Sequence, residues 1–262
     1  MTGTALVTGG SRGLGRAAAR ALTAAGFSVA VTGRDADALA AVVAAGEAAL
    51  ALPGDATDQA SVASAVQQTQ SRLGSLDLLL ANAGAFAAGG RLWETDPSVW
   101  WRDVEVNLRG PQLALHAALP GMVARGRGRV VLMGSGFGMA PTPGASAYAS
   151  SKAAVARLVD TVAAELVGTG VTLLAVSPGM VATDMTHGFP AGFLAHRPDL
   201  EAPAPEAWSP PEQFVTLLLR IAAGELDALH GRFVRARDDL ECAVAAAQRS
   251  DEAGTLRLTP FS

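Results

Sequence analysis

Short runs of apolar residues recur along this chain and end at glycine or at small polar residues. Their content of valine and leucine, and the glycine or proline that follows them, favour strands over helices. The run at 76–84 is almost wholly apolar at its start, which is typical of a strand covered on both faces of a sheet. We predict strands within 4–10, 27–34, 49–55, 76–84, 128–135, 171–179 and 231–236.

The longer stretches between these runs carry apolar residues at helical spacing. Asp35 precedes one stretch and is expected to cap it, whereas Gly26 and Gly74 follow two others and are expected to end them. We predict helices within 11–26, 35–48, 58–74, from Pro97 to Ala124, 146–168 and 210–224, and a short Ala-rich helix near the C-terminus.

Strand and helix alternate along the whole chain. This order predicts an α/β fold with a doubly wound parallel sheet of about seven strands, helices on both faces and right-handed crossovers. Neither a repeat nor a linker divides the chain, so residues 1–262 are expected to form a single domain. The irregular stretch at 183–211, rich in Pro, Gly and Phe, is interpreted as a lid over a functional site.

Composition and charge narrow the class of protein. Half of the residues are apolar, but the excess is alanine, and no apolar stretch approaches the ~20 residues of a spanning helix. The first ten residues lack the basic and apolar regions of a signal peptide. The net charge is −4 and the arginines are scattered, which argues against nucleic acid and membrane surfaces as partners. We expect a cytoplasmic protein in which the lone Cys242 is a helix-packing residue.

Several residue types have almost vanished from the sequence. The chain has one lysine, one tyrosine, one isoleucine and two asparagines, whereas alanine and arginine are abundant. Our hypothesis is a genome-wide bias, under which a surviving residue tends to be one that chemistry cannot replace. The lone tyrosine, Tyr148, and the lone lysine, Lys152, are four positions apart in a predicted helix and so share one of its faces.

A phenol and an ammonium on one helical face can act as a pair in proton transfer. A free phenol has a pKa near ~10, and a neighbouring ammonium favours the phenolate. We therefore expect Lys152 to lower the pKa of Tyr148 towards neutrality, where a catalytic acid or base works best. The alternative is a buried tyrosine beside a lysine whose amine reaches solvent.

A glycine-rich turn joins the first predicted strand to the first predicted helix. The sequence TGGSRGLG at 8–15 has the spacing G-x-x-x-G-x-G. Glycines there allow the backbone to approach a pyrophosphate, and the start of the helix offers oriented N–H groups. Taken alone, the turn is equally compatible with a tight connection that binds nothing.

Six motifs follow one another in a fixed order. They are TGGSRGLG at 8–15, ANAG at 81–84, Asn107, Ser135, YASSK at 148–152 and SPGMVATDM at 177–185. With them the chain resembles the short-chain dehydrogenase/reductases, which are Rossmann-fold, NAD(P)-dependent oxidoreductases. Two positions depart from the family: Ala81 replaces a usual asparagine, and of Gly134, Ser135 and Gly136 only Ser135 lies at the usual distance before the tyrosine.

The resemblance implies hydride transfer between a nicotinamide and a carbonyl or secondary alcohol. Tyr148 would exchange a proton with the substrate oxygen, and Ser135 would donate a hydrogen bond to that oxygen. Lys152 would also hold the nicotinamide ribose, and Asn107 would anchor a water that leads protons towards Lys152.

The end of the second predicted strand bears on the choice of cofactor. Enzymes that prefer NAD place an acidic residue there, but this chain has Gly33 followed by Arg34. Arg34 and Arg12 are expected to meet a 2′-phosphate, because a guanidinium matches phosphate in charge and geometry. NADP(H) is therefore expected, whereas NAD(H) remains possible if Asp35 takes the role of the acid.

The resemblance also implies the other cofactor contacts, with Asp55 and Ala56 beside the adenine and 178–183 near the nicotinamide. No metal site is expected. Besides Arg34, Tyr148 and Lys152, the expected cofactor-binding residues are Gly9, Ser11, Arg12, Gly13, Leu14, Gly15, Asp55, Ala56, Asn82, Ala83, Gly84, Pro178, Gly179, Val181 and Thr183.

The substrate side is expected to be mostly apolar. Lid residues His187 and His196 are interpreted as solvent-facing or substrate-contacting, and Asp184, Asp238 and Asp239 as caps or surface charges. Eight apolar residues after predicted strands or in the lid either contact substrate or pack the lid: Phe86, Phe137, Met139, Met180, Phe189, Phe193, Leu194 and Trp208.

The expected partners are a small carbonyl or alcohol substrate and further copies of the chain. Related enzymes pair the long helix before Tyr148 and the helix that carries it with a second subunit, so a homodimer or homotetramer is expected. Trp100 and Trp101 are interpreted as core or interface residues. Two other functions stay open: a cofactor-binding regulator that has lost turnover, and an imine reductase or epimerase on the same fold.

Overall fold

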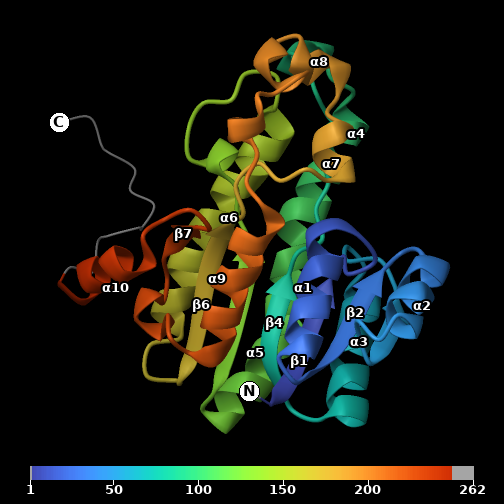
Figure 1. Ribbon diagram of the computed structural model, residues 1–262. Coiled ribbons are helices and arrows are strands. Elements are labelled where there is room, and N and C mark those ends of the chain that lie inside the picture. Colours follow the sequence, from blue (N-terminus) through green and yellow to red (C-terminus); the bar gives the residue numbers. More distant parts are fainter. Residues whose placement is uncertain (1, 250–262) are drawn as a thin grey trace.

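A single sheet of seven parallel strands forms the centre of the computed structural model, which describes residues 2–249 (Figure 1). The predicted domain also includes Met1 and residues 250–262, which lie outside the described part. The strand order is β3-β2-β1-β4-β5-β6-β7, so the predicted doubly wound α/β fold is confirmed. The strands are β1 (Gly3–Thr8), β2 (Phe27–Gly33), β3 (Leu50–Pro53), β4 (Leu76–Ala81), β5 (Gly128–Met133), β6 (Val171–Ser177) and β7 (Phe233–Arg235).

Helices cover both faces of the sheet (Figure 1). One face is covered by α1 (Gly13–Ala24), α2 (Ala36–Ala44) and α9 (Pro211–Ala223), with α10 (Leu240–Arg249) packed beside them. The other face is covered by α3 (Gln59–Leu73), α5 (Gly110–Arg125) and α6 (Ser146–Glu165). Because each strand is buried from both sides, its sequence is a nearly continuous apolar run.

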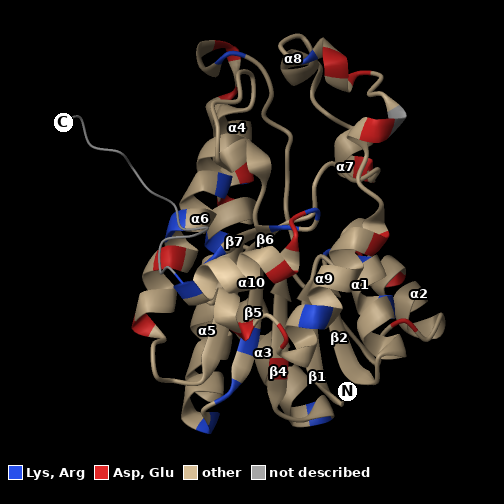
Figure 2. Ribbon diagram, turned by 60° about the vertical axis from the view of Figure 1, so that its left-hand side comes forward, with Lys and Arg blue, Asp and Glu red and all other residues tan. Residues whose placement is uncertain are grey.

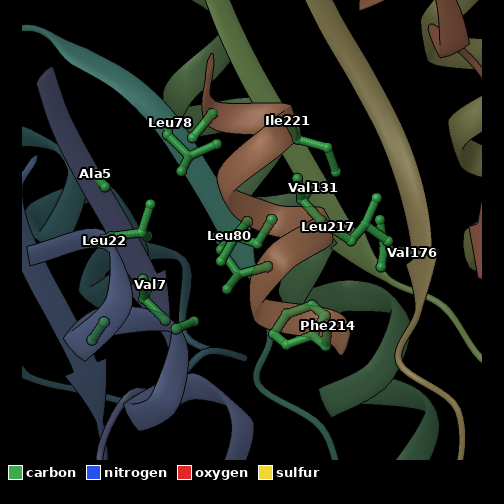
Figure 3. Close-up of a cluster of buried hydrophobic side chains, with 14 of the residues drawn as sticks. Ala5, Val7, Leu22, Leu78, Leu80, Val131, Val176, Phe214, Leu217 and Ile221 are labelled. Carbon is green, nitrogen blue, oxygen red and sulfur yellow. The ribbon is translucent and has the colours of Figure 1, made fainter. Parts of the chain in front are cut away.

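Alternate residues of a strand point to opposite faces and join different cores. In β1, Ala5 and Val7 pack with Leu22 of α1, and Phe214 of α9 belongs to the same core (Figure 3). Leu6, between them, belongs to the core under α3 and α5. This division places the two helix layers and leaves the carboxyl edge of the strands free for a site.

The predicted helix starts and ends are largely confirmed. The Asp35 side chain accepts the N–H of Ala38 at 2.9 Å and caps α2. Gly26 and Gly74 have φ angles of 95° and 105°, which side chains rarely adopt. Gly74 is the C-cap of α3, and Gly26 lies one residue beyond the C-cap of α1.

The helical region predicted from Pro97 to Ala124 is interrupted. It consists of α4 (Pro97–Val104), a π-helical turn at Glu105–Arg109 and α5. The periodicity of the sequence does not reveal this turn, because it adds a single residue to the helical repeat. Such turns are frequent at functional sites, and this one carries Asn107.

The stretch at 183–211 lies beyond the carboxyl ends of the strands, at the top of Figure 1. It is less irregular than expected, since it contains α7 (Asp184–His187), α8 (Ala191–Leu194) and two 3-10 turns at Pro198–Leu200 and Pro205–Ala207. These elements are too short to read from hydrophobic periodicity.

The structure bears on the expectations about Cys242, the distribution of charge and membrane-spanning helices. The interpretation of Cys242 as a packing residue is wrong, because its side chain on α10 is exposed. Charged residues are scattered over the surface in Figure 2. Within residues 2–249, no helix has the length and apolar character to cross a bilayer.

The turn between β1 and α1 brings backbone into close contact with backbone. Gly9 has a φ angle of 65°, and a Cβ there would lie 2.9 Å from the Ala83 Cα. A Cβ at Gly15, on the first turn of α1, would overlap the carbonyl oxygen of Gly9. Glycine is therefore required at both positions.

We predict that Gly15→Ala lowers the free energy of unfolding by about 1–3 kcal/mol, since overpacking against backbone cannot be relieved by a side-chain rotation. Denaturant unfolding measures the change. Gly136→Ala is the matched control, because a Cβ there meets nothing within 4 Å, and its effect should stay within about 0.5 kcal/mol. If Gly15→Ala were as stable as the wild type, the turn would have to accommodate a Cβ at this position, and the prediction would be wrong.

Candidate active site

A cleft of about 630 Å³ runs along the carboxyl edge of the sheet. Its volume is within the ~300–1,000 Å³ of typical ligand pockets. The cleft passes the junction of β1 and β4, where the strand order reverses and where sheets of this kind bind ligands. Arg34 and Asp55 lie at the β2–β3 side, and Ser135 and Lys152 at the side of β5 and β6.

Most of the residues that the sequence suggested line this cleft. Three do not: Gly15 packs against the glycine turn, and Val181 and Asn107 are buried beside the cleft. The lining includes Gly9, Ser11, Arg12, Gly13, Leu14, Arg34, Asp55, Ala56, Asn82, Ala83, Gly84, Ser135, Tyr148, Lys152, Pro178, Gly179 and Thr183.

The glycine turn is fastened to the end of β4. The Thr8 hydroxyl accepts the N–H groups of Asn82 at 3.0 Å and Ala83 at 3.1 Å. The Asn82 amide donates to the carbonyl oxygens of Thr8 at 3.0 Å and Gly9 at 3.1 Å. A Cβ at Gly13 would meet only Thr183, at 3.7 Å, so the start of α1 stays accessible. A bare turn with accessible helix N–H groups fits the diphosphate of a dinucleotide.

Tyr148 and Lys152 lie on one face of α6, as the spacing predicted. The Lys152 amine is buried, with 4% of the residue exposed, and donates to the Met133 carbonyl oxygen at the end of β5 at 2.8 Å. It lies 5.6 Å from the centroid of the Tyr148 ring. The alternative in which this amine reaches solvent is therefore wrong.

The predicted effect of Lys152 on its partner is also wrong. Burial raises the pKa of Tyr148 above its usual value, a hydrogen bond with Ser135 opposes this, and the charge of Asp103 raises the pKa further. Burial lowers the pKa of Lys152 to about 8. The low-dielectric surroundings disfavour both charged forms, and the amine is directed to the Met133 carbonyl instead of the phenol oxygen.

Ser135 follows β5 and faces the same end of the cleft. Its backbone is extended, and its hydroxyl oxygen accepts the N–H of Phe137 at 3.2 Å. The hydrogen bond with Tyr148 brings two hydroxyl groups together beside Lys152. This arrangement can present two O–H donors to one substrate oxygen.

Asn107 is fully buried on the π-helical turn. Its Oδ1 accepts the N–H of Ala85 at 2.9 Å and its Nδ2 donates to the Ala85 carbonyl at 2.8 Å. The side chain therefore holds the loop that follows β4. Its role in a proton path through water stays a prediction.

Asp55, expected beside the adenine, is held by its own surroundings. Its carboxylate accepts from the N–H and hydroxyl of Thr57, both at 2.8 Å, and from Arg102 at 2.7 Å. Burial opposes ionisation, but the hydrogen bonds of Thr57 and Arg102 outweigh it and lower the pKa of Asp55 to about 2. Asp55 thus contributes a fixed negative charge to this end of the cleft.

The two arginines expected at a 2′-phosphate differ in their surroundings. Arg12 forms an exposed ion pair with Asp184 at 2.9 Å. Asp184 is the first residue of α7, whose cap is Thr183, and its exposed carboxylate fits the interpretation as a surface charge. Arg34 is exposed on the cleft and forms no ion pair within residues 2–249. Asp35 caps α2, and the contact of Arg34 with a 2′-phosphate stays a prediction.

The apolar residues expected at the substrate mostly pack together. Only Phe86 of the eight lines the cleft, and its ring stacks on Tyr148 with centroids 4.7 Å apart and planes at 16°. Phe189 and Phe193 pack around Phe86. His187 contacts the Trp208 ring edge-on at 5.8 Å. The wall of the substrate region is therefore one aromatic ring supported by others.

Three residues stand out among the cleft residues that sequence reasoning missed. Arg102 binds Asp55, and Met185 of α7 reaches the region of Gly84. Asp103 is a buried carboxylate that precedes Asn107 by four positions. That spacing on a predicted helix was a usable signal for Asp103, whereas the other two depend on the folded lid and loops.

Comparisons with known proteins agree with this geometry. The family model for short chain dehydrogenases matches residues 3–192. A short chain dehydrogenase of Pseudocercospora fijiensis is 35% identical over 260 residues, which cover 94% of this chain and 84% of the relative. A 2-dehydro-3-deoxy-L-rhamnonate dehydrogenase (NAD(+)) of Sphingomonas sp. is 36% identical over 174 residues, covering 66% and 70%.

Solved structures give the same result. The structure of a variant of actinorhodin polyketide ketoreductase with NADPH matches with a TM-score of 0.80 and 26% sequence identity. The match covers 89% of this chain and 95% of the ketoreductase chain. The fold is therefore shared along nearly the whole chain.

The buried amine generates a prediction about stability. At pH 7 Lys152 is charged in both the folded and the unfolded chain, so its burial penalty is fully present. Between about pH 8 and 10.5 the folded protein loses this proton while the unfolded chain keeps it, and the penalty disappears. The lowering of the pKa of Lys152 from 10.5 to about 8 corresponds to a burial penalty of about 3 kcal/mol.

We predict that Lys152→Met raises the free energy of unfolding at pH 7 by about 1–3 kcal/mol, because the lost hydrogen bond to Met133 offsets part of the gain. The gain should shrink as the pH rises from 8 to 10.5. Denaturant unfolding at several pH values measures it, with the exposed Arg20→Met as a control that changes charge equally. A variant less stable than the wild type at pH 7 would contradict the prediction.

Proposed function

The chain belongs to the short chain dehydrogenase family, and we propose that it is an NADP(H)-dependent oxidoreductase acting on a carbonyl or secondary alcohol of a mostly apolar small molecule. The observation that carries the proposal is the pair of the half-buried Tyr148 and the buried Lys152 at one end of a cleft that begins at a glycine turn.

The cleft is suited to a dinucleotide along its length. The glycine turn and the start of α1 would hold the diphosphate, Asn82 to Gly84 the central backbone, and Lys152 the nicotinamide ribose. When bound, the nicotinamide supplies or accepts the hydride. The chain's own residues then have to orient the substrate oxygen and move one proton.

Tyr148 is the proton donor to that oxygen during reduction. The raised pKa of Tyr148 keeps its hydroxyl protonated at neutral pH, so the proton moves only as negative charge develops on the substrate oxygen. Ser135 donates a second hydrogen bond to the same oxygen. The hydrogen bond between Ser135 and Tyr148 opposes the rise in the pKa, and solvent returns a proton to the phenolate that forms. Oxidation follows the same path in reverse, with the phenolate as base.

The preference for NADP(H) rests on Arg34. It is exposed on the cleft, while the competing acid, Asp35, is used as the cap of α2. Arg12 adds less, because Asp184 already pairs with it. One similar protein is described with NADPH and another with NAD(+), so the similarity alone does not favour either cofactor. We therefore base the preference on the residues at the end of β2.

The proposal includes an apolar substrate, a subunit partner and a location. Phe86 gives the cleft wall beside Tyr148 its apolar character.

Trp101 on α4 is 58% exposed, and α4 packs against α6, which supports a homodimer or homotetramer through these helices. Trp100, by contrast, donates to the Ser146 hydroxyl at 3.0 Å and belongs to the subunit itself. A cytoplasmic location is proposed on composition alone.

A panel of ketones, aldehydes and cyclic imines tests the proposal, with NADPH and NADH compared by nicotinamide absorbance. We expect reduction of apolar ketones with NADPH. Tight cofactor binding without turnover of any substrate would favour the regulator, and faster turnover of imines than of ketones would favour the imine reductase.

We predict that Tyr148→Phe lowers kcat for reduction by about 10²–10⁴, which is the usual contribution of a general acid. NADPH affinity, measured by fluorescence, should change little because the ring is retained. Ser150→Ala, an exposed neighbour in the same motif, is the control and should keep its activity. Full activity of Tyr148→Phe would disprove the assigned role.

We predict that Arg34→Ala raises KM for NADPH by about tenfold or more, because a charge-assisted hydrogen bond contributes about 1.5–3 kcal/mol. KM for NADH should stay unchanged. Steady-state kinetics with both cofactors measure the difference, and Arg20→Ala on α1 controls for the loss of charge. Equal changes for the two cofactors would remove the basis of the NADP(H) preference.

A further inference from the structure

Asp103 is a buried carboxylate for which the proposed reaction has no role. It lies on α4 with 1% of the residue exposed, and no cation forms an ion pair with it within residues 2–249. Its sequence neighbour Arg102 points to Asp55 and Glu105 instead. Burial raises the pKa of Asp103, and the N–H groups of Ala88 and Ala87 oppose the rise. A buried carboxylate without a counter-ion lowers the stability of the fold, and such groups are found most often at functional sites.

The carboxylate holds the loop that follows β4. Asp103 accepts the N–H of Ala87 at 2.9 and 3.1 Å and the N–H of Ala88 at 2.9 Å. Together with Asn107, which binds both backbone groups of Ala85, it fixes the loop on either side of Phe86. This loop has no regular secondary structure, so side chains must satisfy its buried N–H groups.

A carboxylate suits this position better than an amide of the same shape. Both N–H groups bond to Oδ2 at 2.9 Å, and the Ala87 N–H also reaches Oδ1 at 3.1 Å. An asparagine could keep the two shorter bonds at its oxygen, but its N–H₂ group would replace Oδ1 and face the Ala87 N–H donor to donor. The loop is therefore held more firmly by Asp103 than by its neutral counterpart.

The residue between the two anchor points is the wall of the reaction site. Phe86 lies flat on the Tyr148 ring, and Phe137 meets the same ring edge-on at 6.3 Å. With these contacts the substrate meets Tyr148 at its hydroxyl end. Any shift of the loop moves Phe86 and changes the space beside that hydroxyl.

We propose that Asp103 is a positioning residue that, through the backbone of Ala87 and Ala88, holds Phe86 against Tyr148 and so excludes bulky substrates from the Tyr148 hydroxyl. This inference rests on the proposed function for its effect on substrates. Two titratable groups lie close to Tyr148: Asp103 on α4 and Lys152 on α6.

The first test is kinetic. Asp103→Asn and Phe86→Leu should each raise the ratio of kcat/KM for a bulky aryl ketone to that for a small ketone by about tenfold, the scale on which pocket contacts discriminate. Because both act through one ring, the double variant should resemble Phe86→Leu alone. The control is Glu94→Gln, which removes the charge of an exposed carboxylate outside the cleft and should leave the ratio unchanged.

The second test needs no turnover. Tyr148 is the only tyrosine of the chain, so alkaline titration of tyrosinate absorbance reports this residue alone. The midpoint should move to lower pH in Asp103→Asn and stay in place in Glu94→Gln, because the variant removes a nearby negative charge. This result is informative even if no substrate is reduced, which separates failure of this inference from failure of the proposed function.

An unchanged substrate ratio in Asp103→Asn, or effects of the two substitutions that simply add, would overturn the proposal. In a protein without turnover, an unmoved tyrosinate midpoint would overturn it. Thermal melting checks that Asp103→Asn folds; if it does not, Phe86→Leu decides alone, and an unchanged ratio in that variant overturns the proposal.

Discussion

The end of the cleft at Tyr148 depends on two buried charged groups, the ammonium of Lys152 and the carboxylate of Asp103, which have no counter-ion among residues 2–249. Each is held by backbone: Lys152 by the Met133 carbonyl and Asp103 by the N–H groups of Ala87 and Ala88. Backbone dipoles at the ends of β5 and β4 thus replace water around the two charges. Such fixed dipoles need little rearrangement when charge develops on a substrate, which is the basis of electrostatic preorganisation.

The short helix α4 connects the two ends of the cleft. Arg102 binds Asp55 near the β2–β3 side, and the next residue, Asp103, binds the loop beside Tyr148. The π-helical turn that follows adds Asn107 to the same loop. A displacement of α4 would therefore be felt at both ends of the cleft. This gives a structural reason for keeping α4 rigid between the loop at Asp55 and the loop that follows β4.

Local pattern was enough to predict the strands and several helix ends, and the family resemblance supplied most of the cleft residues. Asp35, Gly26 and Gly74 are recognisable because each acts on its immediate neighbours in the chain. Contacts between distant segments were not predictable in this way. Arg12 and Asp184 are 172 positions apart, and their pairing depends on how α7 lies against the glycine turn. The aromatic contacts of Phe86 likewise depend on how the lid and loops pack.

The pKa of Tyr148 illustrates the limit of spacing arguments. Four residues of separation place an amine and a phenol on one face, but they do not say what surrounds the pair. In the folded chain, burial acts on both groups in the direction of their neutral forms, so Tyr148 holds its proton more tightly and Lys152 less tightly. A tyrosine that keeps its proton at neutral pH is ready to act as a donor, whereas oxidation of an alcohol requires the phenolate. Burial thus acts against the phenolate form of Tyr148 and against the charged form of Lys152, which the spacing of the two residues alone does not indicate.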